Sequence, residues 1–159
     1  MIGRTPGRMR LCTVLLILNL VFIWGNSMLP FSVSSALSQW VKDLIRLFLP
    51  GNGEEAQGHG LLRKVAHFCE FCMLGFLFAW LYGMQRKTWS SVALLSIGCA
   101  SATACLDEVI QMFSPGRNPN ILDVGLDTAG AAVGVAVLWA GYIIYQKKKM
   151  KNIVTGGKL

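Results

Sequence analysis

Apolar residues gather along the chain in four long runs, and charged residues gather between and beyond them. A run of about 20 apolar residues crosses the hydrocarbon core of a bilayer as a helix, and a helix needs no hydrogen-bond partner from lipid. The runs therefore predict four membrane-spanning helices, at about residues 8–27, 65–84, 90–113 and 123–146. We expect an all-α integral membrane protein, a four-helix bundle that forms one domain over residues 1–159.

The segment between the first two runs has a different pattern. From about residue 32 to residue 49, apolar residues recur at helical spacing, while polar and charged residues occupy the opposite face. This pattern predicts an amphipathic helix in the first outer loop, lying flat in the membrane interface with Trp40 shallowly buried. The alternative is that this helix packs against the bundle.

Composition agrees with a membrane protein, because 53% of the residues are hydrophobic and only 14% are charged. The net charge is +7, but the basic residues follow the ends of the apolar runs and form no separate basic and aromatic patch. That distribution indicates membrane topology and contact with anionic lipid headgroups. It is not typical of nucleic-acid binding. Membrane lipids are therefore predicted as partners, and nucleic acid is not.

The basic residues also predict the orientation of the helices. Ten of the fifteen Lys and Arg residues fall at the two termini and in the short loop near residues 84–88. Short segments rich in Lys and Arg stay in the cytoplasm. We therefore expect a multi-pass protein of the cell membrane with both termini cytoplasmic, and with residues 26–64 and 114–122 outside.

Alternating direction brings the polar residues of different spans to one depth. In this topology the second and fourth spans begin at the outer face, and the third span ends there. The polar residues expected to meet at that face are His67, Glu70, Asp107, Glu108, Gln111, Arg117, Asp123 and Asp127. They include five of the eight acidic residues of the chain. Charged residues cost roughly 2.5 to 3.5 kcal/mol at the centre of a membrane helix, so they are rare there unless paired or functional.

Two interpretations of this polar group stay open. In the structural one, Arg117, Arg63 and Lys64 neutralise the carboxylates and hold the helix ends together. In the functional one, the group forms a pocket open to the exterior, able to bind a cationic or phosphate-bearing group or a metal. No cofactor is predicted, and whether a metal binds is left open.

Sequence motifs cover the same polar positions. They are N-S-M-L-P at residues 26–30, R-K-V-A-H-F-C-E-F at 63–71, D-E-V-I-Q-M-F-S-P-G-R-N-P-N-I-L-D-V at 107–124, and G-x-x-x-G at 130–134. Together they resemble the VanZ family of small bacterial membrane proteins, which is associated with resistance to the glycopeptide antibiotic teicoplanin. The chain departs from the family pattern at Phe71, where a Tyr is expected, and at Asp127, where an Asn is more usual.

The resemblance implies a protein that lowers susceptibility to teicoplanin-type lipoglycopeptides. It also implies that the polar group above, apart from Asp127, contains candidate site residues. Our leading hypothesis is non-enzymatic: an outer-facing pocket binds an envelope component, such as a lipid-linked envelope precursor, or the lipid part of the antibiotic, and so limits access to cell-wall precursors.

Two other functions are compatible with the residues. The first is a membrane enzyme that acts on a lipid-linked envelope precursor, with His67, Asp107, Glu108 and Asp123 as metal ligands or as acid and base. The chain has neither a specific nucleophile motif nor an H-E-x-x-H signature, which argues against this enzyme. The second is a proton-coupled carrier, which would have to be a homo-oligomer because four spans without a repeat form no path alone.

Overall fold

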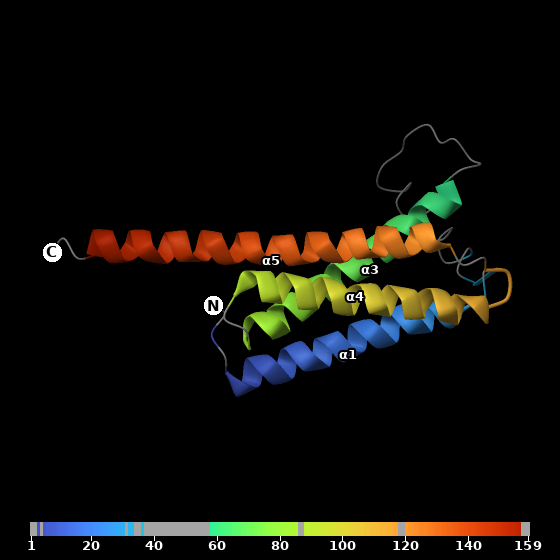
Figure 1. Ribbon diagram of the computed structural model, residues 1–159, viewed down its shortest axis with the longest axis horizontal. Coiled ribbons are helices and arrows are strands. Elements are labelled where there is room, and N and C mark those ends of the chain that lie inside the picture. Colours follow the sequence, from blue (N-terminus) through green and yellow to red (C-terminus); the bar gives the residue numbers. More distant parts are fainter. Residues whose placement is uncertain are drawn as a thin grey trace.

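The computed structural model describes residues 3, 5–30, 32, 33, 36, 58–85, 88–117 and 120–156. Within these residues it contains no strand and four long helices (Figure 1): α1 (Pro6–Met28), α3 (Gly58–Gly83), α4 (Trp89–Met112) and α5 (Ile121–Gly156). All four are long and apolar enough to cross a membrane. The prediction of an all-α, four-helix membrane protein is confirmed.

The helix ends follow local sequence signals. α1 begins after Thr5, whose hydroxyl accepts a hydrogen bond from the Arg8 N–H at 3.4 Å, and Pro6 occupies its first turn. α5 continues past the predicted end of its span at residue 146, because the lysine-rich tail contains no helix breaker before Gly156. Most of the amphipathic helix predicted over about residues 32–49, Trp40 included, lies outside the described residues and stays a prediction.

Helix α5 is longer than a membrane span requires. Its 36 residues give a length of about 54 Å at 1.5 Å per residue, whereas the hydrocarbon core is about 30 Å thick. Its C-terminal part extends beyond the other helices (Figure 1) and carries the exposed lysines at positions 147–149. The start of α1 lies at this same end of the bundle (Figure 1).

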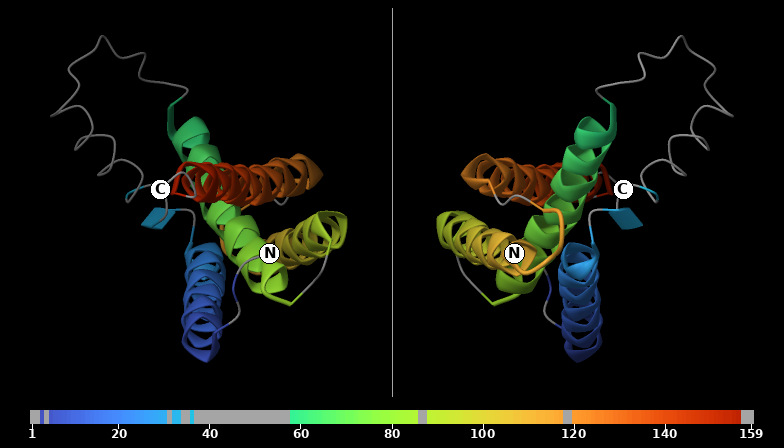
Figure 2. Two further views of the ribbon diagram at one scale, coloured as in Figure 1. Left: turned by 90° about the vertical axis from the view of Figure 1, so that its left-hand side faces the viewer. Right: turned by 90° about the vertical axis from the view of Figure 1, so that its right-hand side faces the viewer.

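Helix α3 runs obliquely through the middle of the bundle, with α1 on one side and α4 on the other (Figure 2). It contacts α1, α4 and α5, and its contact with α5 is the most extensive in the described structure. Phe71 and Leu74 of α3 are fully buried in a core with Ile23 of α1 and Ala100 and Ala104 of α4. The small residues Ala100 and Ala104 therefore face the neighbouring helices, where small side chains allow close packing.

Glycines allow the close approach of α3 and α5. A Cβ atom at Gly134 would overlap the carbonyl oxygen of Cys72, and one at Gly130 would overlap that of Phe68. From the other side, a Cβ atom at Gly75 of α3 would overlap the carbonyl oxygen of Ala131. The G-x-x-x-G motif of the sequence thus lies where the two backbones touch.

We predict that Gly134→Ala destabilises the protein and that Gly141→Ala does not. The new methyl group at Gly134 meets backbone atoms and forces the helices apart, which typically costs about 1 to 3 kcal/mol. At Gly141 no atom lies within 4 Å of the new position, so the better helix propensity of Ala raises stability by up to about 1 kcal/mol. The free energy of unfolding in mixed detergent micelles checks this, and equal effects of the two substitutions would contradict the packing described.

Candidate functional site

The predicted polar residues do meet at one end of the bundle. At this end α1 and α4 finish and α3 and α5 start (Figure 1). The end lies opposite the start of α1 and the end of α5, as the alternation of helix direction predicts. The side chains there come from four helices and from the short loop between α4 and α5.

The loop from α4 to α5 is tied to the end of α1. Gly116, which follows Pro115 in the loop, adopts a positive φ of 77°, a conformation that favours glycine. The Ser114 hydroxyl donates to the Ser27 carbonyl at 2.8 Å. Arg117 donates from Nε to the Leu29 carbonyl at 3.1 Å and from Nη2 to the Asn26 carbonyl at 2.7 Å. These bonds satisfy carbonyl groups that a helix leaves unpaired at its C-terminus.

Arg117 is therefore a connector between the loop and α1. Its side chain is buried, and among the described residues it forms no ion pair with a carboxylate within 4 Å. Burial lowers the pKa of Arg117 from its usual value, although an arginine keeps its charge in proteins. The pairing of Arg117 with Asp107 or Asp123 that the structural interpretation assumed is not present in the described structure.

Glu108 links α4 to the start of α5. Its Oε2 accepts the backbone N–H of Asn120 at 2.9 Å, and the Asn120 side chain accepts the N–H of Leu122 at 3.1 Å. Asn120 thereby caps the first turn of α5. Glu108 fixes where α5 begins and so helps to place Asp123 and Asp127.

A polar cavity of about 80 Å³ lies between α3, α4 and α5 at this end. The residues that line it are Arg63, Lys64, His67, Glu108, Gln111, Asp123, Leu126 and Asp127. At its rim, Lys64 Nζ lies 3.2 Å from Asp123 Oδ1, and the Lys64 side chain is 52% exposed. The structural interpretation had Lys64 neutralise a carboxylate, and this ion pair does so.

A chain of hydrogen bonds leads from the rim to the interior. Arg63 Nη2 donates to Gln111 Oε1 at 2.8 Å, and Gln111 Nε2 donates to Asp107 Oδ2 at 2.7 Å. Gln111 stands one helical turn after Asp107 on α4, so the two share a face. The amide orients the Asp107 carboxylate and links it to the Arg63 guanidinium.

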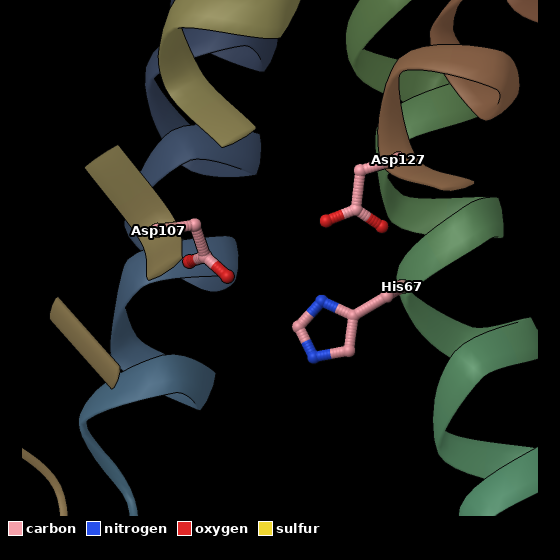
Figure 3. Close-up of side chains that lie close together, drawn as sticks. All are labelled: His67, Asp107 and Asp127. Atoms are coloured by element: carbon pink, nitrogen blue, oxygen red, sulfur yellow. The ribbon is translucent and has the colours of Figure 1, made fainter. Parts of the chain in front are cut away.

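Three ionisable side chains from three helices converge at the buried end of this series of hydrogen bonds. His67 of α3, Asp107 of α4 and Asp127 of α5 point toward one another (Figure 3). One ligand atom of each lies within 4.8 Å of one of each of the others. The residues are 7%, 0% and 2% exposed, in that order. Such a buried group of titratable side chains is a candidate functional site.

Most of the coordinating atoms of these three residues lack partners. Both ring nitrogens of His67, Oδ1 of Asp107 and Oδ1 of Asp127 have no hydrogen bond within the described part of the chain. Glu70 Oε2 lies 3.7 Å from His67 Nδ1, which is longer than a hydrogen bond. The other Glu70 oxygen accepts a hydrogen bond from Asn26 Nδ2 at 3.1 Å. Glu70 therefore contacts α1 as well as His67.

A family model described as VanZ/LLP1 matches residues 12–145, which is most of the chain. The chain belongs to the VanZ/LLP1 family. Neither the curated proteins nor the solved structures compared with it contain a match. This VanZ/LLP1 protein is a multi-pass membrane protein with four candidate spans, and the resemblance found in its motifs is confirmed.

The structure divides the eight predicted site residues of this VanZ/LLP1 protein by position. His67, Glu108, Gln111, Asp123 and Asp127 line the cavity, and Asp107 joins it through Gln111 and His67. Glu70 and Arg117 lie beside the cavity, bonded to α1.

Two cavity residues were absent from the predicted site. Arg63 and Lys64 were considered only as pairing partners of the carboxylates. They precede His67 by four and three positions, the spacing of neighbours on one helix face. That spacing alone places them near the imidazole.

We predict that Arg117→Met destabilises the fold more than Lys64→Met. Losing the buried guanidinium removes two hydrogen bonds to carbonyl groups at the C-terminal end of α1, and hydrogen bonds to charged groups contribute about 1.5 to 3 kcal/mol. The half-exposed Lys64 contributes at most about 1 kcal/mol through its ion pair. Thermal unfolding in detergent, compared between the two variants, checks this order. The reverse order would show that Arg117 does not hold α1.

Proposed function

We propose that this VanZ/LLP1 protein lowers susceptibility to teicoplanin-type glycopeptides by binding the polar head of an envelope component at the outer end of its bundle. The observation that supports this proposal is the cavity itself, which combines two basic residues at its rim with carboxylates and an imidazole further in. A concave site with a few convergent polar groups between helices is where ligands commonly bind. Family membership supports the proposed phenotype.

The size of the cavity restricts the ligand. Its volume of about 80 Å³ is well below the roughly 300 to 1,000 Å³ of pockets that hold drug-sized ligands. A whole glycopeptide does not fit, whereas a phosphate or a small cationic group does. We therefore favour the head of an envelope lipid, such as a lipid-linked precursor, whose chains would lie along the apolar outer faces of the helices.

Charge supports a phosphate-bearing head. Arg63 and Lys64 stand together at the rim, and arginine and lysine are the usual protein partners of phosphate. Arginine has five N–H donors, so its bond to Gln111 leaves others for a ligand. Lys64 pairs with the partly exposed Asp123. An ion pair this exposed is weak, and a phosphate can replace it.

A second candidate function is a membrane enzyme that acts on a lipid-linked envelope precursor. The observation that favours it is the buried convergence of His67, Asp107 and Asp127 beside the same cavity. An imidazole and a carboxylate within reach of one ligand are suited to general acid and base catalysis. Turnover of a radiolabelled lipid-linked precursor by the purified protein would favour this candidate over simple binding.

The first prediction concerns the basic rim. In a teicoplanin-susceptible host, the wild-type protein should raise the minimum inhibitory concentration of teicoplanin. The double variant Arg63→Gln/Lys64→Gln should lose this effect, because it removes the groups proposed to bind phosphate. The matched control is Lys147→Gln/Lys148→Gln, which removes the same charge from the exposed tail. Full resistance from the rim variant at wild-type abundance would contradict the proposal.

The second prediction concerns orientation, since the proposed ligand reaches the site from outside. We expect a reporter fused after Lys87 to give a cytoplasmic signal and one fused after residue 119 to give an external signal, because the basic loop and termini stay inside. Alkaline phosphatase fusions report an external position, and green fluorescent protein fusions report a cytoplasmic one. A cytoplasmic signal after residue 119 would place the cavity on the wrong side for this function.

A further inference from the structure

We propose that His67, Asp107 and Asp127 together bind a divalent transition-metal ion of the zinc class at the inner end of the polar cavity. Each residue comes from a different helix, and the three side chains point toward one another (Figure 3). Such a site would join α3, α4 and α5 through a single ion. Nothing in the sequence motifs groups these three residues, because Asp127 lies outside the motif at residues 107–124.

The spacing of the ligand atoms suits a metal. They lie within 4.8 Å of one another. Zinc binds imidazole nitrogen and carboxylate oxygen at about 2.0 to 2.2 Å, so two of its ligands are separated by at most about 4.4 Å. The three atoms therefore lie close to a coordinating arrangement, and a modest adjustment of the side chains would be needed to close the remaining gap.

The burial of unpartnered atoms is the independent observation that points to a ligand. His67 is more than nine-tenths buried, and neither of its ring nitrogens has a hydrogen bond in the described part of the chain. One oxygen of each aspartate is in the same condition. Leaving a buried polar group unsatisfied costs about 1 to 3 kcal/mol. A bound ion would satisfy all of these residues at once.

The two carboxylate charges favour a divalent cation over a monovalent one. Asp107 and Asp127 are fully or almost fully buried beside each other, and neither forms an ion pair within 4 Å among the described residues. Two adjacent buried carboxylates repel each other strongly. A divalent cation neutralises both charges, while the neutral imidazole adds a third ligand without adding charge.

Gln111 prepares Asp107 for this role. Its amide donates to Asp107 Oδ2 at 2.7 Å and leaves Oδ1 directed elsewhere and unpartnered. A hydrogen bond to the second oxygen of a ligating carboxylate is a usual way to orient it toward a metal. The imidazole ligand indicates zinc, or iron and similar transition metals, because calcium and magnesium prefer sites made of oxygen atoms alone.

Three protein ligands leave one coordination position open toward the cavity. Zinc sites with three protein ligands keep such a position for water or substrate. Here it would face the space beside Arg63 and Lys64, where a phosphate oxygen of the envelope lipid could complete the coordination. This last step rests on the proposed function, whereas metal binding itself does not.

The test is zinc binding by the purified full-length protein in detergent, measured by calorimetry and by metal analysis after dialysis. We expect one zinc ion per chain for the wild type and no comparable uptake of calcium. The double variant Asp107→Asn/Asp127→Asn keeps the shape of both side chains and removes their charge. It should weaken zinc binding by at least about tenfold to a hundredfold, the effect that even outer-shell changes produce at metal sites. His67→Gln should do the same.

Controls separate this site from other acids of the cavity. Asp123→Asn changes a cavity residue outside the three and should weaken zinc binding much less than the double variant does. Absence of stoichiometric zinc binding by folded wild-type protein would overturn the inference, as would equal losses from Asp123→Asn and from the double variant. If zinc binds as expected while teicoplanin susceptibility is unchanged by the protein, the proposed function fails and the metal site stands. If the protein confers teicoplanin resistance but binds no zinc, the metal site fails and the proposed function stands.

Discussion

The close contact between the backbones of α3 and α5 is the constraint on which the outer site depends. Gly130 touches the backbone of Phe68, the residue after His67, and Asp127 stands one helical turn before Gly130. Any side chain at Gly130 would separate the helices and widen the space between His67 and Asp127. The packing motif in the apolar part of the bundle therefore sets the geometry of the polar part.

The sequence was sufficient to predict the spans and the meeting of their polar ends. In lipid, every backbone group must be satisfied within a helix, so apolar run length predicts a span almost directly. Alternating direction then brings residues such as His67, Asp107 and Asp123 to one end, and the structure places them there. The G-x-x-x-G motif is a pattern common at close helix contacts, and its glycines lie at such a contact.

Individual partners could not be predicted, because they depend on how each helix is rotated about its axis. Asp123 and Asp127 are equivalent by sequence spacing, yet Asp123 pairs with Lys64 at the rim and Asp127 meets His67 inside. In the structural interpretation Arg117 would neutralise a carboxylate, but it binds carbonyl groups at the end of α1. That contact spans most of the chain length, and no local pattern indicates it.

The account as a whole requires His67 and Asp127 to act as one polar unit held together by helix packing. A double-mutant cycle in the presence of zinc, with His67→Gln, Asp127→Asn and their combination, measures this directly through the free energy of unfolding. Residues that share one partner show coupling of about 0.5 to 3 kcal/mol. We expect the double variant to lose less stability than the sum of the single losses, by an amount in that range. Losses that add to within about 0.3 kcal/mol would mean that the two residues are independent, and would contradict the account.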